Sequence, residues 1–383
     1  MKRIILVLLV SVICGSFVFA GGGQAAKPAA AASVQELTYD ELVAAAKAEG
    51  RVVVYSITSR IAPAAAAFEA KYGIKVEHSN LNDGQLIQRV STEVGGGVHG
   101  ADFVIAQDSG RVWGQLIAPG HLVNYVPSSM KNVIPESDQN PLVMMYINKV
   151  FGFNSERGED PVISNVWEVT EPQWKGLTQF KDPNTEGVNF NFLTMITGPE
   201  WSDKLAQAYQ ARYGSPIVLS TGCENAGFEW IKRWFENGLV LTNSDTAMAE
   251  NIGMRGQPQT TMAIFAYTKA RFDAVKNLTL APIIDGDPFA GFYYPAYLML
   301  TSNAANPNAA KLFIEYLLTE EGFYPNWGID VGTYSSNPTI RLNDGDFPIS
   351  FWAPRLVPED PQFIFRNRAK VEQFVNNIAF SGR

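Results

Sequence analysis

Short runs of apolar and β-branched residues alternate along the chain with segments whose apolar positions have helical spacing. The first three runs, residues 51–55 (RVVVY), 74–76 and 102–106 (DFVIA), predict strands, and helices are predicted between them at 62–72 and 84–94. An unbroken β-branched run is typical of a strand that is buried on both faces. Strands that alternate with helices at this spacing predict a parallel, doubly wound α/β sheet.

The rest of the chain repeats this alternation between two longer β-rich stretches, residues 142–153 and 278–300, the second of which is interrupted at 285–288 (DGDP). Between these two stretches the pattern predicts strands at 177–180 and 261–266 and helices from about 188, at 201–213 and at 224–237. A helix over 309–318 and a last helix near 368–378 follow. An α/β unit inserted between two long strands indicates two lobes that are joined by two crossings.

The first 20 residues have the pattern of a secretory signal peptide. A basic start at Lys2 and Arg3 precedes an apolar stretch, Ile4 to Phe19, and a small-residue cleavage site ends at Ala20. The stretch is shorter than a typical membrane-spanning helix, so we expect an exported protein in the periplasm. Cys14 leaves lipid attachment as an alternative, although the bulky Ile13 precedes it where small residues are expected. The low-complexity residues 21–35 are expected to form a flexible tether.

Composition, cysteine count and the absence of catalytic motifs argue against several classes of function. Hydrophobic residues make up 46% of the 383 residues, and the net charge of −8 becomes −10 when Lys2 and Arg3 leave with the signal peptide. An acidic chain without a Lys/Arg run does not favour nucleic-acid binding. Cys223 is the one cysteine beyond the signal peptide, so no internal disulfide is expected. Nucleophile-elbow, HExxH and Walker A motifs are absent from the sequence, and we predict neither an enzyme nor a bound cofactor.

Four segments resemble the type II periplasmic solute-binding proteins of ABC transporters. They are ELVAAAKAEGRVVVYSITS, DFVIAQDSG, VWEVTEPQWKGLTQFKDPNTEG and PAYLMLTSNAANPNAAKLFIEYLLTEEGF, within residues 36–330. The resemblance implies two α/β lobes, each a doubly wound mixed sheet, a two-strand hinge, a ligand held in the cleft, and an ABC permease with its ATPase as partners. It also implies a division into residues 36–146 (first lobe), 147–287 (second lobe) and 288–383 (return to the first lobe and C-terminal helices).

The branch that the chain resembles includes binders of ferric iron, hexose phosphates and pyridoxal phosphate. Its iron binders coordinate metal with two adjacent tyrosines after the strand that matches residues 261–266, where this chain has Tyr267 alone. A tyrosine pair, Tyr293 and Tyr294, lies instead on the predicted return strand. His78, His99 and His121 lack metal-ligand spacing, and no metal site is predicted.

Candidate binding residues follow the predicted strands, because ligands in open α/β sheets lie beyond the carboxyl ends of the strands. Small hydroxyl residues beside a guanidinium at a helix start suit a tetrahedral oxyanion. Carboxylates and amides at the equivalent ends suit sugar hydroxyls, and tyrosines suit a flat ring. The candidates are Ser56, Thr58, Ser59, Arg60, Asp83, Gln107, Asp108, Ser109, Asp182, Thr185, Tyr267, Tyr293 and Tyr294.

Each candidate also has a purely structural explanation. Ser59, Asp83, Asp108 and Thr185 are good helix caps or turn residues, and the tyrosines pack well into a core. The sequence nevertheless favours a protein, expected to be a monomer, that captures a small anionic solute, an organic phosphate such as a sugar phosphate or pyridoxal phosphate, for an ABC importer. A ferric-iron-binding protein is the alternative.

Overall fold

The computed structural model describes residues 37–158 and 160–381. The predicted signal peptide, the tether and Cys14 lie outside the described residues. Within the described part of the chain, no helix combines the length and the apolar character that a membrane crossing requires.

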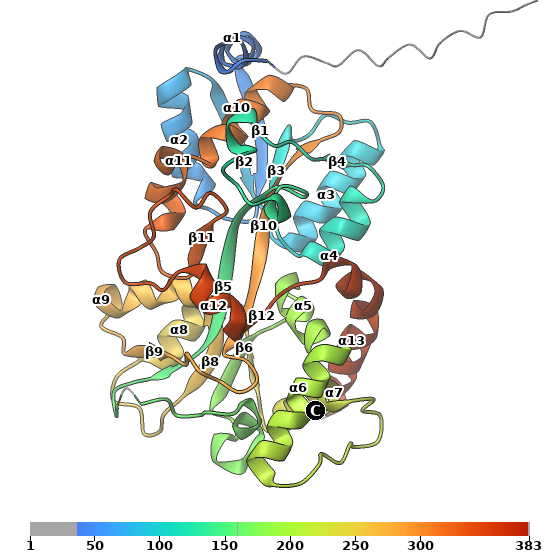
Figure 1. The fold of residues 1–383 in the computed structure, drawn as a ribbon, viewed down its shortest axis with the longest axis vertical. Coiled ribbons are helices and arrows are strands. Elements are labelled where there is room, and N and C mark those ends of the chain that lie inside the picture. The colour runs from blue at the N-terminus through green and yellow to red at the C-terminus, as the bar shows by residue number, and fades with distance from the viewer. Residues whose placement is uncertain (1–36, 159, 382–383) are drawn as a thin grey trace, which may run out of the picture. The chain divides into compact units, whose positions relative to one another are not determined.

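The first lobe is built on parallel strands that pair in the order β2-β1-β3 (Figure 1). Its elements are α1 (Tyr39–Glu49), β1 (Arg51–Ser56), α2 (Ile61–Tyr72), β2 (Lys75–Asn80), α3 (Asp83–Gly95), β3 (Phe103–Ala106), α4 (Ser109–Arg111) and β4 (Leu122–Val123). Alternate side chains of β1 enter two cores. Val52 and Val54 pack with α2 and α10 residues on one face, and Tyr55 packs with α3 residues on the other. Helices therefore cover both faces, as the unbroken apolar run predicts.

The second lobe has the strand order β8-β6-β7, again parallel. Its elements are β6 (Thr178–Lys181), α5 (Gly187–Ile196), α6 (Pro199–Tyr213), α7 (Ala226–Glu236), β7 (Val240–Thr242), α8 (Asp245–Gly253), β8 (Met262–Ala266), α9 (Phe272–Lys276) and β9 (Leu280–Pro282). Met262 and Ile264 of β8 face an aromatic core with Trp167, Trp230 and Trp234, while Ala263 and Phe265 face α8.

Two long antiparallel strands, β5 (Val143–Asn154) and β10 (Gly291–Thr301), join the lobes into one sheet. β10 pairs with β3 in the first lobe and β5 pairs with β8 in the second, and the two strands pair with each other from Gly291–Val150 to Tyr297–Val143. Successive side chains of a strand point to opposite faces. The predicted pair of crossings is thereby confirmed, and each crossing presents one set of side chains to either face of the hinge.

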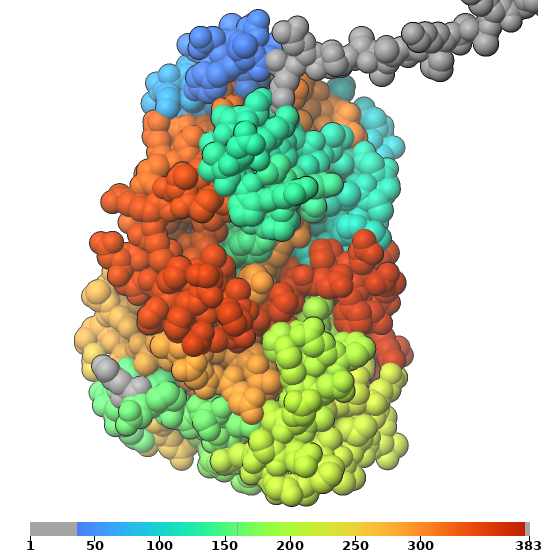
Figure 2. All heavy atoms as spheres, viewed as in Figure 1, coloured from blue at the N-terminus to red at the C-terminus, as the bar shows by residue number. Residues whose placement is uncertain are grey.

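The chain after β10 contacts both lobes. It comprises α10 (Pro307–Leu317), α11 (Glu320–Phe323), β11 (Thr333–Ser335), α12 (Ile349–Trp352), β12 (Leu356–Val357) and α13 (Pro361–Ser381). Helix α10 packs against α1, whereas α13 packs against α5 and α7 of the second lobe and α4 of the first. In Figure 2 this orange-red segment lies between the teal first-lobe surface and the yellow-green second-lobe surface. The division at residues 146 and 287 stays a prediction, and α13 belongs to neither lobe alone.

Candidate functional site

A cleft of about 210 Å³ lies on one face of the hinge strands and receives residues from both lobes. Met145 and Ile147 of β5 and Tyr294 of β10 form its floor. The carboxyl ends of β1, β3, β6 and β8 supply the polar walls, as expected where parallel strands end at one edge of a sheet. The polar residues are Thr58, Arg60, Gln107, Lys181, Glu186, Asp245, Thr268, Lys269, Arg271 and Thr333.

Two lysines and two carboxylates form a buried cluster on the second-lobe side of the cleft. Lys149 of β5 is fully buried and donates hydrogen bonds to Glu186 and, at 3.2 Å, to Asn189 Oδ1. Its Nζ lies 3.2 Å from Asp245 Oδ1. Lys181 Nζ lies 3.0 Å from Asp245 Oδ2 and 3.2 Å from Glu186 Oε1. The four charges cancel within the cluster.

This charge pairing shifts the pKa values of Asp245 and Lys181. Burial by itself would raise the pKa of Asp245, but the Lys149 and Lys181 ammonium groups outweigh it and hold that pKa well below its usual range. Burial opposes the charged form of Lys181, yet Asp245 and Glu186 raise the pKa of its ammonium group. Asp245 and Lys181 are therefore held in their charged forms by the opposite charges around them.

A second ionic group joins the start of α2 to the segment that follows β8. Arg60 donates to Asp330 and to the Asn326 carbonyl. Arg271 Nη1 donates to the same Asp330 Oδ2 at 3.0 Å and to the Thr268 carbonyl at 2.7 Å. Asp330 is 5% exposed. One buried carboxylate is thus shared by two guanidinium groups, which leaves one positive charge in excess.

Lys269 adds a further positive charge to the cleft. Within the described part of the chain, its ammonium group has neither a hydrogen bond nor an ion pair to a neighbouring side chain. Burial, followed by the positive charge of Arg271, lowers its pKa, while the negative charge of Asp245 acts in the opposite direction. Five cationic side chains in and behind the cleft face three carboxylates, so the site carries an excess of two positive charges.

Four predicted binding residues line this cleft: Thr58, Arg60, Gln107 and Tyr294. Ser56 does not line the cleft but contacts the backbone of Thr58, which does. Its hydroxyl is fully buried and donates to the Thr58 carbonyl at 3.1 Å. Ser59 is exposed and does not line the cleft. The contribution of these side chains to ligand binding stays a prediction.

Three predicted residues lie instead where the two lobes touch beside the cleft. Asp83 Oδ2 accepts a hydrogen bond from the Gly187 backbone at 2.9 Å, and Asp108 Oδ1 accepts one from Arg368 at 2.7 Å. Ser109 follows Asp108 and is 1% exposed. Asp83 and Asp108 thus hold a backbone N–H of the opposite lobe and a side chain of α13, and none of the three residues lines the cleft.

The remaining predicted residues are placed elsewhere by the fold. Asp182 and Thr185 form a turn, in which the Thr185 hydroxyl donates to the Asp182 carbonyl at 2.8 Å. Tyr267 packs edge-on against Trp352, with ring centroids 5.7 Å apart. Tyr293 lies on the opposite face of β10 from Tyr294 and lines a different cavity. The structure does not bring these four residues into the cleft.

Sequence reasoning missed most of the charged residues of the cleft, namely Lys181, Glu186, Asp245, Lys269 and Arg271, and also Lys149 in the cluster behind it. Lys181 ends β6, and Lys269 and Arg271 follow β8 directly. The rule that selected residues after β1 and β3 would therefore have found these three. Lys149 carried no such signal, because a lysine within an apolar strand run does not reveal its partners.

Comparison with solved structures shows the fold. Iron-bound HitA from Pseudomonas aeruginosa is 15% identical with a TM-score of 0.66, and the match covers 86% of this chain and 99% of HitA. AfuA from Actinobacillus pleuropneumoniae, solved with fructose-6-phosphate, is 20% identical with a TM-score of 0.64 and coverage of 86% and 99%. Trichodesmium IdiA (FutA), with iron and citrate, is 16% identical with a TM-score of 0.60 and coverage of 86% and 100%.

The shared architecture is the two-lobed, type II periplasmic-binding-protein fold with mixed α/β lobes, as the resemblance implied. No curated protein sequence matches the chain. Residues 56–322 match the family described as bacterial extracellular solute-binding protein, which is well over half of the sequence. The chain therefore belongs to the family of bacterial extracellular solute-binding proteins.

Proposed function

We propose that this protein captures a small anionic solute, an organic phosphate such as a sugar phosphate or pyridoxal phosphate, in the cleft between its lobes. The observation that carries the proposal is the excess of positive charge in the cleft, above all Lys269, which lacks an ionic partner among the described residues. A partly buried cation without a counter-ion is unfavourable, and a bound phosphate would supply the missing negative charge.

The lining also fits the geometry of a phosphate ester. Guanidinium groups form paired hydrogen bonds with phosphate oxygens, and the hydroxyls of Thr58, Thr268 and Thr333 add donors. Trp327 and Tyr294 offer ring surfaces for the organic part of the solute. Because both lobes supply donors, a ligand that bridges them would favour the closed form. We propose that a periplasmic monomer delivers this solute to the permease and ATPase of an ABC importer, and that it binds without catalysis.

The test is a thermal-shift screen of the mature protein. The panel contains glucose-6-phosphate, fructose-6-phosphate, pyridoxal phosphate, aminoethylphosphonate, the free sugars and ferric citrate. Binding to the native state stabilises it by roughly 2.7 kcal/mol at a hundredfold excess over Kd. We expect a rise in melting temperature with at least one phosphate ester and none with the corresponding free sugar.

Lys269→Met provides the matched variant, since it removes the unpaired ammonium group and keeps the length of the side chain. The phosphate-dependent shift should fall strongly in this variant. Lys175→Met, at an exposed position outside the cleft, should leave it unchanged. A shift that is the same for phosphate ester and free sugar, or that survives Lys269→Met, would contradict an anion site.

The iron-bound structures of HitA and of IdiA (FutA) favour a second candidate, ferric-iron binding. In this chain the adjacent Tyr293 and Tyr294 lie on opposite faces of β10, so they do not converge on one ion. Burial, with the nearby Asp346 and Asp273, raises the pKa of Tyr267 to about 12, which opposes the phenolate that iron prefers. A shift with ferric citrate alone, accompanied by visible colour, would replace the phosphate proposal with iron.

A further inference from the structure

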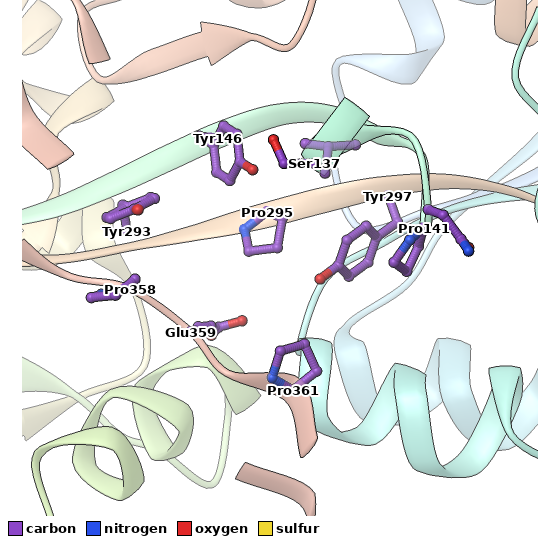
Figure 3. Close-up of a pocket in the computed structure, with 11 residues that line it drawn as sticks. Ser137, Pro141, Tyr146, Tyr293, Pro295, Tyr297, Pro358, Glu359 and Pro361 are labelled. Atoms are coloured by element: carbon purple, nitrogen blue, oxygen red, sulfur yellow. The ribbon is translucent and has the colours of Figure 1, made fainter. Parts of the chain in front are cut away.

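A second cavity, of about 270 Å³, lies on the opposite face of the hinge strands (Figure 3). Tyr146 of β5 faces this cavity, whereas its neighbours Met145 and Ile147 face the cationic cleft. On β10, likewise, Tyr293 faces this second cavity and Tyr294 faces the cationic cleft. The hinge ribbon therefore separates two cavities whose linings can be compared directly.

Aromatic rings form much of this second lining. Tyr146 and Tyr293 pack edge to face with their centroids 5.6 Å apart, and Tyr297 extends into the same space (Figure 3). The Tyr146 hydroxyl donates to the buried Asp138 at 2.9 Å, so its ring is fixed in place. Four prolines complete the apolar wall, and no Lys, Arg or His is among the described residues of the lining.

Glu359, in the segment between β12 and α13, supplies a carboxyl group to this lining. Its Oε1 accepts a hydrogen bond from Asn191 at 2.8 Å. Its Oε2 is shielded from solvent and, within the described part of the chain, accepts no hydrogen bond of normal geometry, although Ser109 lies beside it. In Figure 3 the carboxyl end points toward Tyr297. Oε2 therefore keeps an unused lone pair, and the Glu359 side chain as a whole lines the cavity.

The nearest cation does not neutralise Glu359. Arg368 donates to Asp108 at 2.7 Å and to Glu372 at 2.6 Å. Burial raises the pKa of Glu359 to about 8, while the Ser109 and Asn191 side chains act in the opposite direction. The carboxyl group therefore lacks a counter-ion, in contrast to Glu186 and Asp245 on the other face of the hinge, which have two lysines.

We propose that this cavity is a binding site for a small organic cation, an alkylammonium headgroup held between the tyrosine rings and the Glu359 carboxylate. Aromatic faces attract a desolvated cation, and a bound cation would favour the ionised form of Glu359 by acting as its counter-ion. The volume is at the small end of ligand pockets, which fits a headgroup rather than a peptide. The ligand would lie at the hinge and leave the cationic cleft free for its own solute.

The test compares choline with its neutral carbon isostere, 3,3-dimethylbutan-1-ol, by calorimetric titration of the mature protein. We expect choline to bind and the isostere to bind about ten-fold more weakly or not at all. Glu359→Gln keeps the acceptor for Asn191 and removes the charge, so it should weaken choline about ten-fold. Glu236→Gln, at an exposed helical position, is the matched control and should bind as the unmodified protein does.

A second pair of variants separates binding from folding. Tyr146→Phe keeps the ring and should retain choline binding, whereas Tyr146→Leu should lose it. The response of each variant to the phosphate ester identified in the screen reports whether the cleft remains intact. Equal binding of choline and its isostere, no binding of either, or choline binding that persists in Glu359→Gln would overturn the proposal. Choline binding that is strengthened by Lys269→Met and unaffected by Glu359→Gln would place the cation in the cleft and overturn it as well.

Discussion

Asp83 and Gly187 are joined by a hydrogen bond in which the Gly187 N–H donates to Asp83 Oδ2 at 2.9 Å. Asp83 begins α3 of the first lobe, and Gly187 begins α5 of the second. Burial, followed by the negative charges of Asp108 and Glu186, raises the pKa of Asp83 to about 7. A contact between the lobes is thus made by a carboxyl group that titrates near neutral pH.

The raised pKa of Asp83 makes this contact pH-dependent. The protonated form is favoured in the folded state, so its stabilising contribution is fully present below the unfolded-state pKa near 3.8 and is lost as pH rises through about 7. Asp83→Asn imitates the neutral form. The variant should therefore become more stable than the unmodified protein as pH rises from 4, by on the order of 4 kcal/mol above pH 7. Thermal unfolding between pH 4 and 8 measures this difference.

The control for this experiment is Asp203→Asn, at an exposed position of α6. Its stability should follow that of the unmodified protein at every pH. Glu359 also has a raised pKa in this range, but it is present in both proteins. Its contribution therefore cancels when the stability of the unmodified protein is subtracted from that of Asp83→Asn. A difference that does not change with pH would show that Asp83 is ionised throughout.

Gly187→Ala should hold the lobes apart. A Cβ at this position would lie 1.9 Å from Asp108 Oδ2, so the α5 N-terminus and Asp108 must separate. We expect ligand affinity to fall about ten-fold or more and the radius of gyration in small-angle X-ray scattering to rise with ligand present. Gly84→Ala is the matched control. It is also in a first helical turn, but its Cβ would meet nothing closer than 3.5 Å. Equal affinities in the two variants would contradict a closing contact here.

Strands and helices with strong local signals could be predicted from the sequence. Helix α1 begins at the Thr38 capping box and ends at Gly50, whose φ is 72°, because both signals are encoded within a few residues. Strand β1 runs from Arg51 to Ser56, one residue longer than its apolar run. Strands β11 and β12 were missed, since two or three residues acquire strand pairing only from the neighbouring β5 and β10.

The candidate site was predictable only where it follows a strand of the first lobe. Thr58, Arg60 and Gln107 were found because β1 and β3 are obvious in the sequence. Lys149 was not, because its partners Glu186 and Asp245 are 37 and 96 residues away and meet it only through the tertiary fold. The sequence also did not show that Tyr293 and Tyr294 face different cavities. Two adjacent tyrosines suggest a pair, but on a β-strand neighbouring side chains point to opposite faces of the sheet.

Lys149→Met should destabilise the protein strongly. The lysine is fully buried, and its removal leaves Glu186 and Asp245 with Lys181 alone. Breaking a buried ion pair from one side costs about 3–5 kcal/mol. Denaturant unfolding should show this loss, and the double variant Lys149→Met with Glu186→Gln should recover part of it. Lys204→Met, which removes an exposed lysine paired with Glu200, should cost about 1 kcal/mol or less. Similar losses in the two lysine variants would mean that water reaches the buried cluster.

Asp330→Asn should change stability and anion affinity in opposite directions. Asp330 is the shared carboxylate of Arg60 and Arg271. Its neutralisation leaves both guanidinium groups without their buried counter-ion, so the free energy of unfolding of the ligand-free protein should fall by about 2 kcal/mol. The same change raises the positive charge of the cleft, so the Kd for a phosphate ester should fall several-fold at low salt and less at high salt. Calorimetric titration at two salt concentrations, beside denaturant unfolding, measures both effects. Weaker binding in parallel with lower stability would mean that Asp330 acts only by positioning the two arginines, and that the charge of the cleft does not determine its affinity.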